Sequence, residues 1–182
     1  LQIITNLSII EILLTILSFP ISKEHDKPLS FLSIKKARLT MNNPAPSKDR
    51  IQIEVLHKIG EVLSSDSELE HSLHKILQLL EERLEMGLGT LTLPQGDSEV
   101  SIDIAHGLSP SEIERGRYKI GEGITGRVVE SGKPVIVPRI SSEPLFLDRT
   151  GARTDREKSQ MSFICIPILL QLEVVGTLSV DT

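Results

Sequence analysis

The sequence predicts an α+β domain, in which a central antiparallel sheet is flanked by amphipathic helices from its N-terminal part. Two observations predict this class. Two segments with helical periodicity come first, and the strand-like segments that follow are joined largely as hairpins. The strand–helix–strand alternation that would predict a parallel sheet is missing from the sequence. A length of 182 residues fits one such domain with an appendage.

Two amphipathic helices open the predicted domain at residue 51. In the first, apolar residues such as Val55 and Ile59 recur at helical spacing. The second is expected to begin at a capping box of Ser67 and Glu70 and to end before Gly87. Such a long apolar stripe packs on a sheet or pairs two subunits. The apolar positions of the second helix are Leu69, Leu73, Ile76, Leu77, Leu80 and Leu84.

Apolar runs separated by turn residues predict the strands. The first two strands are joined by a turn at residues 94–97, and the last two meet at Gln171 and Leu172. Gly176 in the last strand predicts a bulge or a close backbone approach. A short helix is predicted after Ser109, with Pro110 as its first residue. The predicted strands cover residues 88–93, 100–105, 135–138, 162–170 and 173–180.

Gly121, Gly123 and Gly126 form a G-x-G-x-x-G pattern, which dinucleotide-binding turns and kinase glycine-rich loops share. The flanking sequence argues against both. The preceding residues are too charged for a central parallel strand, and the other kinase motifs are missing. We therefore expect a structural role, with Gly121 and Gly123 in a tight turn of positive φ. A short helix over residues 124–131 should follow, ended by Gly132 and seated closely on the sheet through Gly126.

The mostly polar segment 141–160 predicts a mobile loop, in which the apolar residues 144–147 form one anchoring turn. This loop also carries three arginines, Arg149, Arg153 and Arg156, beside Phe146. Guanidinium groups bind planar oxyanions in a bidentate manner, so the three arginines could clamp a small dicarboxylate or phosphate. The alternative is that they only keep the loop soluble.

Composition argues against several functional classes. A formal net charge of −5, with no Trp and one Tyr, offers no basic or base-stacking surface for nucleic acid. The single cysteine, Cys165, excludes an internal disulfide and a cysteine-rich metal centre, and fits a reducing cytoplasm. Both faces of its strand look apolar, so Cys165 is expected to be a buried thiol. His71 and His74 lack a further ligand signature, and we predict neither a metal site nor a catalytic residue.

Residues 1–40 differ from the rest of the chain, because Ile and Leu make up 16 of them while Gly and Val are absent. Three interpretations compete: translation from upstream of a true start at Met41, a native disordered or membrane-associated extension, and a signal peptide. We favour the first, since the apolar run contains Asn6 and Glu11 and follows no basic segment. Residues 41–50 would then be a polar leader before the domain at residues 51–182.

The residues around the glycine pattern resemble the GAF domain family. The matching stretches are R-Y-K-I-G-E-G-I-T-G-R-V-V at 117–129, G-K-P-V at 132–135 and V-P-R-I at 137–140. More narrowly, P-L-F-L-D-R at 144–149 and M-S-F-I-C-I-P-I at 161–168 resemble the GAF domains of the NifA family of nif-specific, sigma-54-dependent activators. The resemblance covers residues 51–182 without the closing C-terminal helix, which indicates a gene fragment.

This resemblance implies a cytoplasmic regulatory domain that is not itself an enzyme and that controls a downstream AAA+ ATPase. It implies 2-oxoglutarate as a possible effector, with no cofactor or metal otherwise, and a NifL-type protein as a possible partner. Sigma-54 RNA polymerase and DNA would be bound only through domains outside this chain. The N-terminal helices would pair two copies into a homo-oligomer, with no membrane association.

A dianionic effector would lie between the sheet and the loop 141–160. The ligand-binding residues that the resemblance implies are Arg139, Phe146, Arg149, Phe163 and Cys165. The alternative identity is a GAF sensor of another signalling protein, such as a histidine kinase or a cyclic-di-GMP enzyme. The N-K-x-D-E pattern of cyclic-nucleotide GAF domains and the cysteine trio of methionine sulfoxide reductases are missing, which argues against those two activities.

Overall fold

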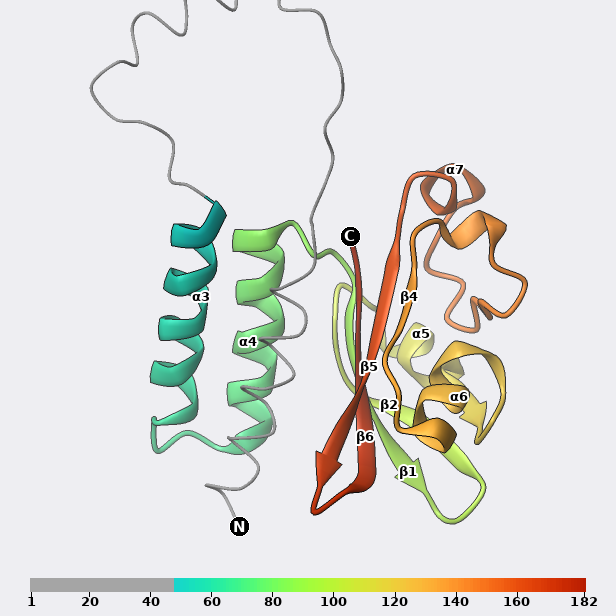
Figure 1. Ribbon diagram of the computed structural model, residues 1–182, viewed down its shortest axis with the longest axis horizontal. Coiled ribbons are helices and arrows are strands. Elements are labelled where there is room, and N and C mark those ends of the chain that lie inside the picture. Colours follow the sequence, from blue (N-terminus) through green and yellow to red (C-terminus); the bar gives the residue numbers. More distant parts are fainter. Residues whose placement is uncertain (1–47) are drawn as a thin grey trace, which may run out of the picture.

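The computed structural model describes residues 48–182 as a six-stranded antiparallel sheet between two layers of helices (Figure 1). The strand order is β3-β2-β1-β6-β5-β4, and every pair is antiparallel. The predicted α+β class is therefore confirmed. Residues 1–47, which include the predicted extension and most of the polar leader, lie outside the described residues. None of the helices within residues 48–182 is long and apolar enough to cross a membrane.

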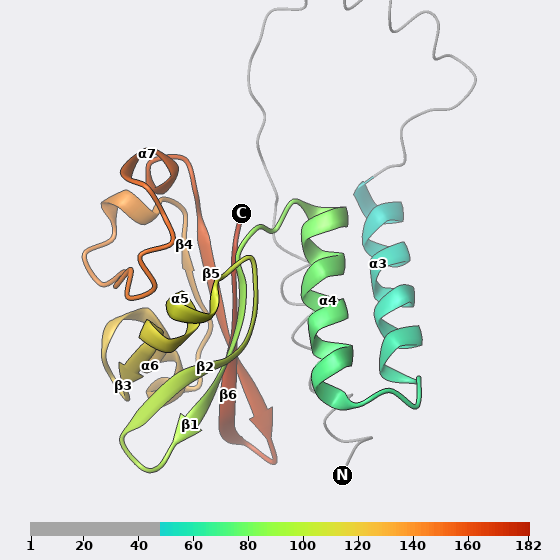
Figure 2. The ribbon, with the colours of Figure 1, turned by 180° about the vertical axis from the view of Figure 1, so that it is seen from behind.

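Two long helices form one layer. Helix α4 (Leu69–Leu84) packs on the sheet, and helix α3 (Lys48–Leu63) lies outside α4, as both views of the ribbon show (Figures 1 and 2). Val55 and Ile59 of α3 and Leu80 of α4 are almost completely buried in one core cluster, which also contains Leu91 and Val180 of the sheet. The stripes thus serve mainly as the packing surface of the larger core.

The ends of α4 differ from the prediction. Glu68 is the N-cap residue and makes no side-chain cap, because the Ser67 hydroxyl accepts a hydrogen bond from Ser65 Oγ at 2.9 Å instead. At the other end Glu85, rather than a glycine, adopts the left-handed conformation with φ 55°. Its amide donates to the carbonyls of the last turn, which is how such caps satisfy them. Gly87 instead donates its amide to the Asp181 carbonyl at 3.0 Å.

The two predicted hairpins are present and supply the four central strands. They are β1 (Gly89–Gln95) with β2 (Glu99–His106), and β5 (Phe163–Leu170) with β6 (Glu173–Asp181). Strands β1 and β6 pair across the middle. The edges are β3 (Arg117–Lys119) and β4 (Val135–Val137). Strand β3 was not predicted, because its charged residues exclude a central position but are tolerated at an edge.

The turn before strand β6 and the glycine within this strand both match the prediction. Gln171 and Leu172 have φ of 52° and 74°, so this tight turn forms without the glycine that such turns prefer. In the pairing of β5 with β6, the register shifts between Ile168 and Leu169. A Cβ on Gly176 would lie 2.5 Å from the Thr92 carbonyl oxygen, which confirms the predicted close approach.

The second face of the sheet is covered by short elements (Figure 2). They are α5 (Pro110–Arg115), α6 (Gly123–Ser131), a 3-10 turn η1 (Ile140–Ser142) and α7 (Asp155–Lys158). Helix α5 begins as predicted, with Ser109 and Glu112 in a capping box. A smaller core of Val128, Phe163 and Cys165 with their neighbours lies beneath these elements.

The glycine pattern has the predicted structural role. Gly121 and Gly123 have φ of 82° and 61°, and Gly132 ends α6 in the left-handed conformation. A Cβ on Gly126 would lie 2.1 Å from the Lys119 carbonyl oxygen. Gly126 therefore lets α6 lie directly on the backbone at the end of β3. Helix α6 is packed in the protein interior, and the glycine pattern before it is not a phosphate-binding turn.

The segment 141–160 is more structured than predicted. Besides η1 it contains α7, whose N-cap Thr154 forms a second capping box with Glu157. Its interior is fixed by ion pairs rather than by the apolar residues 144–147 alone. The expectation of a single anchoring turn was wrong, because the pairing of Asp148 with Arg153 and Lys158 depends on the path of the folded loop and is not visible in its composition.

Candidate functional site

The candidate site is a small cavity between the second face of the sheet and residues 146–153. Its volume is about 20 Å³, which is room for about one water molecule. Strands β1 and β2 form the floor, α6 closes one side and the loop forms the roof. The lining residues are Thr90, Thr92, Ile102, Tyr118, Ile124, Thr125, Phe146, Leu147, Thr150, Arg153 and Phe163.

A row of buried hydroxyl groups crosses the floor beneath the cavity. In the β1–β6 register, Thr90 lies opposite Ser179 and Thr92 lies opposite Thr177. These side chains alternate with core residues such as Leu178, so they share the face that the loop covers. The Thr92 and Thr177 hydroxyls are hydrogen-bonded at 2.5 Å. Ser179 Oγ has no hydrogen-bond partner among residues 48–182, although Ser179 is only 2% exposed.

Two aromatic rings form the apolar part of the roof. The rings of Phe146 and Phe163 meet edge to face, with centroids 5.0 Å apart. The Arg153 guanidinium lies 5.2 Å from the centroid of Phe146. This distance is within the range of a cation–π interaction. Phe146 thus connects the charged and the apolar parts of the roof.

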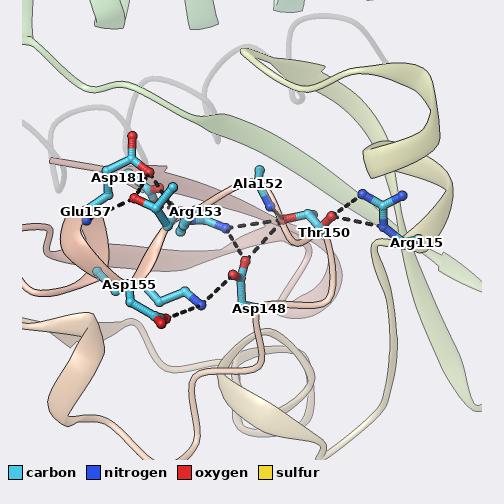
Figure 3. A network of polar contacts seen from close by, with 10 residues as sticks. Arg115, Asp148, Thr150, Ala152, Arg153, Asp155, Glu157 and Asp181 are labelled. Carbon is cyan, nitrogen blue, oxygen red and sulfur yellow. Dashed lines mark hydrogen bonds and ion pairs between the residues drawn. The ribbon is translucent and has the colours of Figure 1, made fainter.

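Arg153 is the centre of a buried ionic network (Figure 3). Its Nε and Nη2 atoms donate to the Asp181 carboxylate at 2.6 and 2.9 Å. Its Nη1 atom donates to Asp148 Oδ1 at 3.1 Å and to Thr150 Oγ1 at 3.3 Å. Lys158 Nζ lies 3.0 Å from Asp148 Oδ2. Arg153, Lys158, Asp148 and Asp181 therefore form a network without net formal charge.

Burial acts on both partners of the central pair. The side chains of Arg153 and Asp181 are 7% and 0% exposed. Burial lowers the pKa of Arg153, but the hydrogen bonds and charges of Asp181 and Asp148 outweigh it, and the net shift is upward. Burial also raises the pKa of Asp181, and Arg153 opposes that shift only in part. Because an arginine keeps its proton, we regard the pair as ionised, and the raised Asp181 pKa as the energetic cost of its burial.

The loop is attached to the rest of the domain at two further points. Arg115 at the end of α5 donates from Nε and Nη2 to the Thr150 carbonyl oxygen, at 3.0 and 2.5 Å. Arg149 forms an ion pair with Glu122 next to α6. Backbone hydrogen bonding from Lys119 lowers the pKa of Glu122, and Arg149 lowers it further. These contacts hold the roof over the cavity.

The structure brings together some of the residues predicted to bind a ligand and separates others. Phe146 and Phe163 line the cavity, and Cys165 is buried in the smaller core beside Phe163. Arg139 is exposed and does not line it. Arg149 is also exposed and faces Glu122. Among the three loop arginines, Arg153 is the one that lines the cavity.

Several polar residues that line the cavity or lie beneath it were not identified from the sequence. Thr90 and Thr92 in β1, and Thr177, Ser179 and Asp181 in β6, place polar residues at every second position of two otherwise apolar strands. This period-2 pattern was readable and predicts a polar patch on one sheet face. Tyr118 carried no such signal. Burial raises the pKa of its phenol to about 12, so it is a neutral hydrogen-bonding group at the rim.

Catalytic and metal chemistry find little support in the described part of the chain. Burial raises the pKa of Cys165 to about 11, and a thiol in that state is a poor nucleophile. Within residues 48–182, no three His, Cys, Asp or Glu side chains gather where they could hold a metal ion. The arrangement is suited to binding a small polar molecule by hydrogen bonds and by one guanidinium.

Comparisons with known proteins agree with this geometry. The family model described as "GAF domain" matches residues 68–182, which leaves α3 outside the match. Nitrogen fixation protein VnfA of Azotobacter vinelandii is 37% identical over 131 residues. The Nif-specific regulatory protein of Azospirillum lipoferum is 33% identical over 135 residues. These matches cover 71% and 74% of this chain but 25% and 22% of those proteins, so the chain spans about a quarter of their length.

Solved structures show the same architecture. The nlh2 GAF domain of A. aeolicus, solved in an inactive state, superposes with a TM-score of 0.64 at 25% sequence identity. That match covers 72% of this chain and 79% of the other. Family, relatives and fold therefore agree over the segment that contains the cavity and its ionic network.

Proposed function

Because this chain belongs to the GAF domain family, we propose that it is the regulatory sensor domain of an activator of nitrogen-fixation genes. Its matched curated relatives include Nif-specific regulatory proteins and the nitrogen fixation proteins VnfA and AnfA, and they match over the GAF region. The observation that carries the proposal is this similarity, at 33 to 37% identity, over a domain with a small polar cavity beneath its loop. A sensor needs a site whose occupancy changes the domain, and the cavity beneath the loop is suited to that.

The proposed effector is a small acidic metabolite such as 2-oxoglutarate. The Arg153 guanidinium matches one carboxylate, and the hydroxyl row with Ser179 offers further hydrogen bonds. The cavity has room for about one water molecule, so a five-carbon acid requires the roof at Phe146 and Leu147 to move outward. Binding would therefore change the loop.

The rest of the regulatory system would lie outside this chain. By analogy with the longer relatives, a cytoplasmic activator would carry an ATPase domain and contact sigma-54 RNA polymerase and DNA through its other segments. A NifL-type protein would be a second input to the same domain. Helices α3 and α4 would pair two copies of the domain, using side chains such as Ile53 and Leu69, which are 67% and 44% exposed.

A chimeric activator tests this function. The full 182-residue chain replaces the matching segment of VnfA, and a reporter measures transcription from the cognate promoter under nitrogen-rich and nitrogen-poor growth. We expect the output to differ by about fivefold or more between the two conditions, the lower end of typical allosteric coupling. A VnfA variant without any GAF segment is the control. Equal output from chimera and control in every condition would refute the proposal.

Binding of the effector is tested separately by thermal unfolding. A ligand that binds only the folded state, at a hundred times its Kd, stabilises that state by about 2.7 kcal/mol. We expect 2-oxoglutarate to raise the Tm by several degrees, and glutaramide, a neutral diamide of the same length, to leave it unchanged. An unchanged Tm with saturating 2-oxoglutarate would leave a protein partner as the input.

A further inference from the structure

The Arg153–Asp181 pair has the geometry that an arginine adopts with a bound carboxylate ligand. Two parallel hydrogen bonds, at 2.6 and 2.9 Å, join Nε and Nη2 to the two carboxylate oxygens. Asp148 contacts the same guanidinium through Nη1 alone and also pairs with Lys158. Asp181 therefore occupies the bidentate position of Arg153, a residue that lines the cavity.

Resting on the function proposed above, we propose that Asp181 is a built-in competitor for the effector. A carboxylate of an acidic ligand takes its place on Arg153, so that ligand binding and release of Asp181 are one event. Two observations make this position a binding site rather than only a structural ion pair. Arg153 lines the cavity, and the buried hydroxyl of Ser179, two residues before Asp181, lies on the same face of β6 next to the Cys165 thiol and without a nitrogen or oxygen partner among the described residues.

Charge considerations favour exchange over simple addition. The four inner members of the network are two cations and two carboxylates, so they already balance. A third carboxylate placed next to Arg153 without displacing Asp181 would leave a buried negative charge uncompensated, which is strongly unfavourable. An acidic ligand must therefore displace a carboxylate. Asp148 retains Lys158 as a partner, whereas the Asp181 side chain has only Arg153 among the described residues.

Released Asp181 would affect the far side of the sheet. Its side chain is fully buried, so without Arg153 the end of β6 must shift until the carboxylate reaches water. The backbone of the same residue pairs with the connection between α4 and β1: its carbonyl accepts from Gly87 at 3.0 Å, and its amide donates to Leu88 at 3.1 Å. A shift of Asp181 therefore strains the connection to the helical layer. Occupancy of the cavity is in this way coupled to α4.

The main test is Asp181→Asn in the full chain, with 2-oxoglutarate titrated by calorimetry. The amide keeps the shape of the side chain but removes the competing charge. If Asp181 holds Arg153 in at least about nine of ten molecules, removing it lowers the apparent Kd about tenfold. Asp155→Asn is the matched control, because it removes an exposed carboxylate near Lys158 that does not touch Arg153. We expect it to change the Kd less than about twofold, and glutaramide to gain nothing in either variant.

A folded Asp181→Asn protein whose affinity is unchanged or weaker would overturn the proposal, as would a tenfold gain in the Asp155→Asn control. If Asp181→Asn does not fold, nuclear magnetic resonance on the unchanged protein decides. At saturating 2-oxoglutarate, we expect the Arg153 Nε–H and Asp181 carboxyl signals to shift together, and exchange of the Gly87 amide to accelerate at least tenfold. Unchanged signals, or no binding at all, would refute the exchange.

These outcomes are independent of the transcriptional test. A regulated chimera with no affinity gain in Asp181→Asn would leave the sensor function standing and remove the exchange mechanism. An affinity gain in an unregulated chimera would support the exchange and remove the proposed role in nitrogen fixation.

Discussion

Replacing Gly126 with alanine tests whether the glycine pattern has a structural role. The new Cβ would lie 2.1 Å from the Lys119 carbonyl oxygen and 3.1 Å from the Gly121 nitrogen, both backbone atoms. Ordinary contact begins at 3.4 Å, so helix α6 and the end of β3 must separate by about 1.3 Å. That displacement breaks the 2.9 Å hydrogen bond from the Gly121 amide to the Gly126 carbonyl.

The magnitude follows from three contributions. Overpacking against a fixed backbone costs about 1–3 kcal/mol, and the broken hydrogen bond costs about 1 kcal/mol. Alanine in a helix recovers about 0.5–1 kcal/mol relative to glycine. We expect Gly126→Ala to lower the free energy of unfolding by about 2 kcal/mol. Gly60→Ala is the matched control, because a Cβ on this glycine of helix α3 meets nothing within 4 Å. It should stabilise the protein by about 0.5–1 kcal/mol.

The assay is urea unfolding of the full chain, followed by far-ultraviolet circular dichroism. The two variants should differ by about 3 kcal/mol, or by about 6–12 °C in Tm for a protein of this size. Equal midpoints for Gly126→Ala and Gly60→Ala would refute the close approach of α6 to β3. If Gly60→Ala lowered the free energy of unfolding, this control would not be reporting helix propensity.

Three further predictions concern the site. Arg153→Met leaves Asp181 buried without its cation and should cost about 3–5 kcal/mol in urea unfolding, whereas Arg149→Met, at the exposed ion pair, should leave the midpoint nearly unchanged. Ser179→Ala removes an unsatisfied buried hydroxyl and should raise the free energy of unfolding by about 1 kcal/mol. Thr92→Val leaves Thr177 without its Thr92 partner and should lower it by about 1–3 kcal/mol. The opposite order of stabilities would contradict the hydrogen bonding described for the hydroxyl row. Burial raises the pKa of Cys165 from 9.0 to about 11. The stability that the neutral thiol contributes is therefore complete below pH 9 and is lost as the pH rises through 11. The total loss in the free energy of unfolding is roughly 3 kcal/mol. Unfolding midpoints measured from pH 7 to 11 should therefore fall more steeply than those of Cys165→Ala, and parallel curves would exclude the thiol as the titrating group.

Sequence reasoning predicted best where a conformation depends on a few neighbouring residues. The positive φ of Gly121 and Gly123, the helix start at Ser109 and the tight turn at Gln171 are local properties, and each was found at its predicted position. Sequence reasoning predicted less well where two local arrangements of the chain have similar free energies. At the start of α4 the Ser67 hydroxyl is engaged within its own turn, and Glu68 takes the capping position.

By itself, the sequence determined the α+β class, the two hairpins and the seat of α6, because periodicity and glycine stereochemistry act within a few residues. Only the tertiary structure decided which cation faces the cavity. Arg149 and Arg153 are alike in sequence, but Asp181, 28 residues beyond Arg153, arrives beside the loop through the pairing of β6 with β1 and β5. A buried carboxylate selects the guanidinium that can reach it with two hydrogen bonds, and such a partner is not visible in the loop sequence.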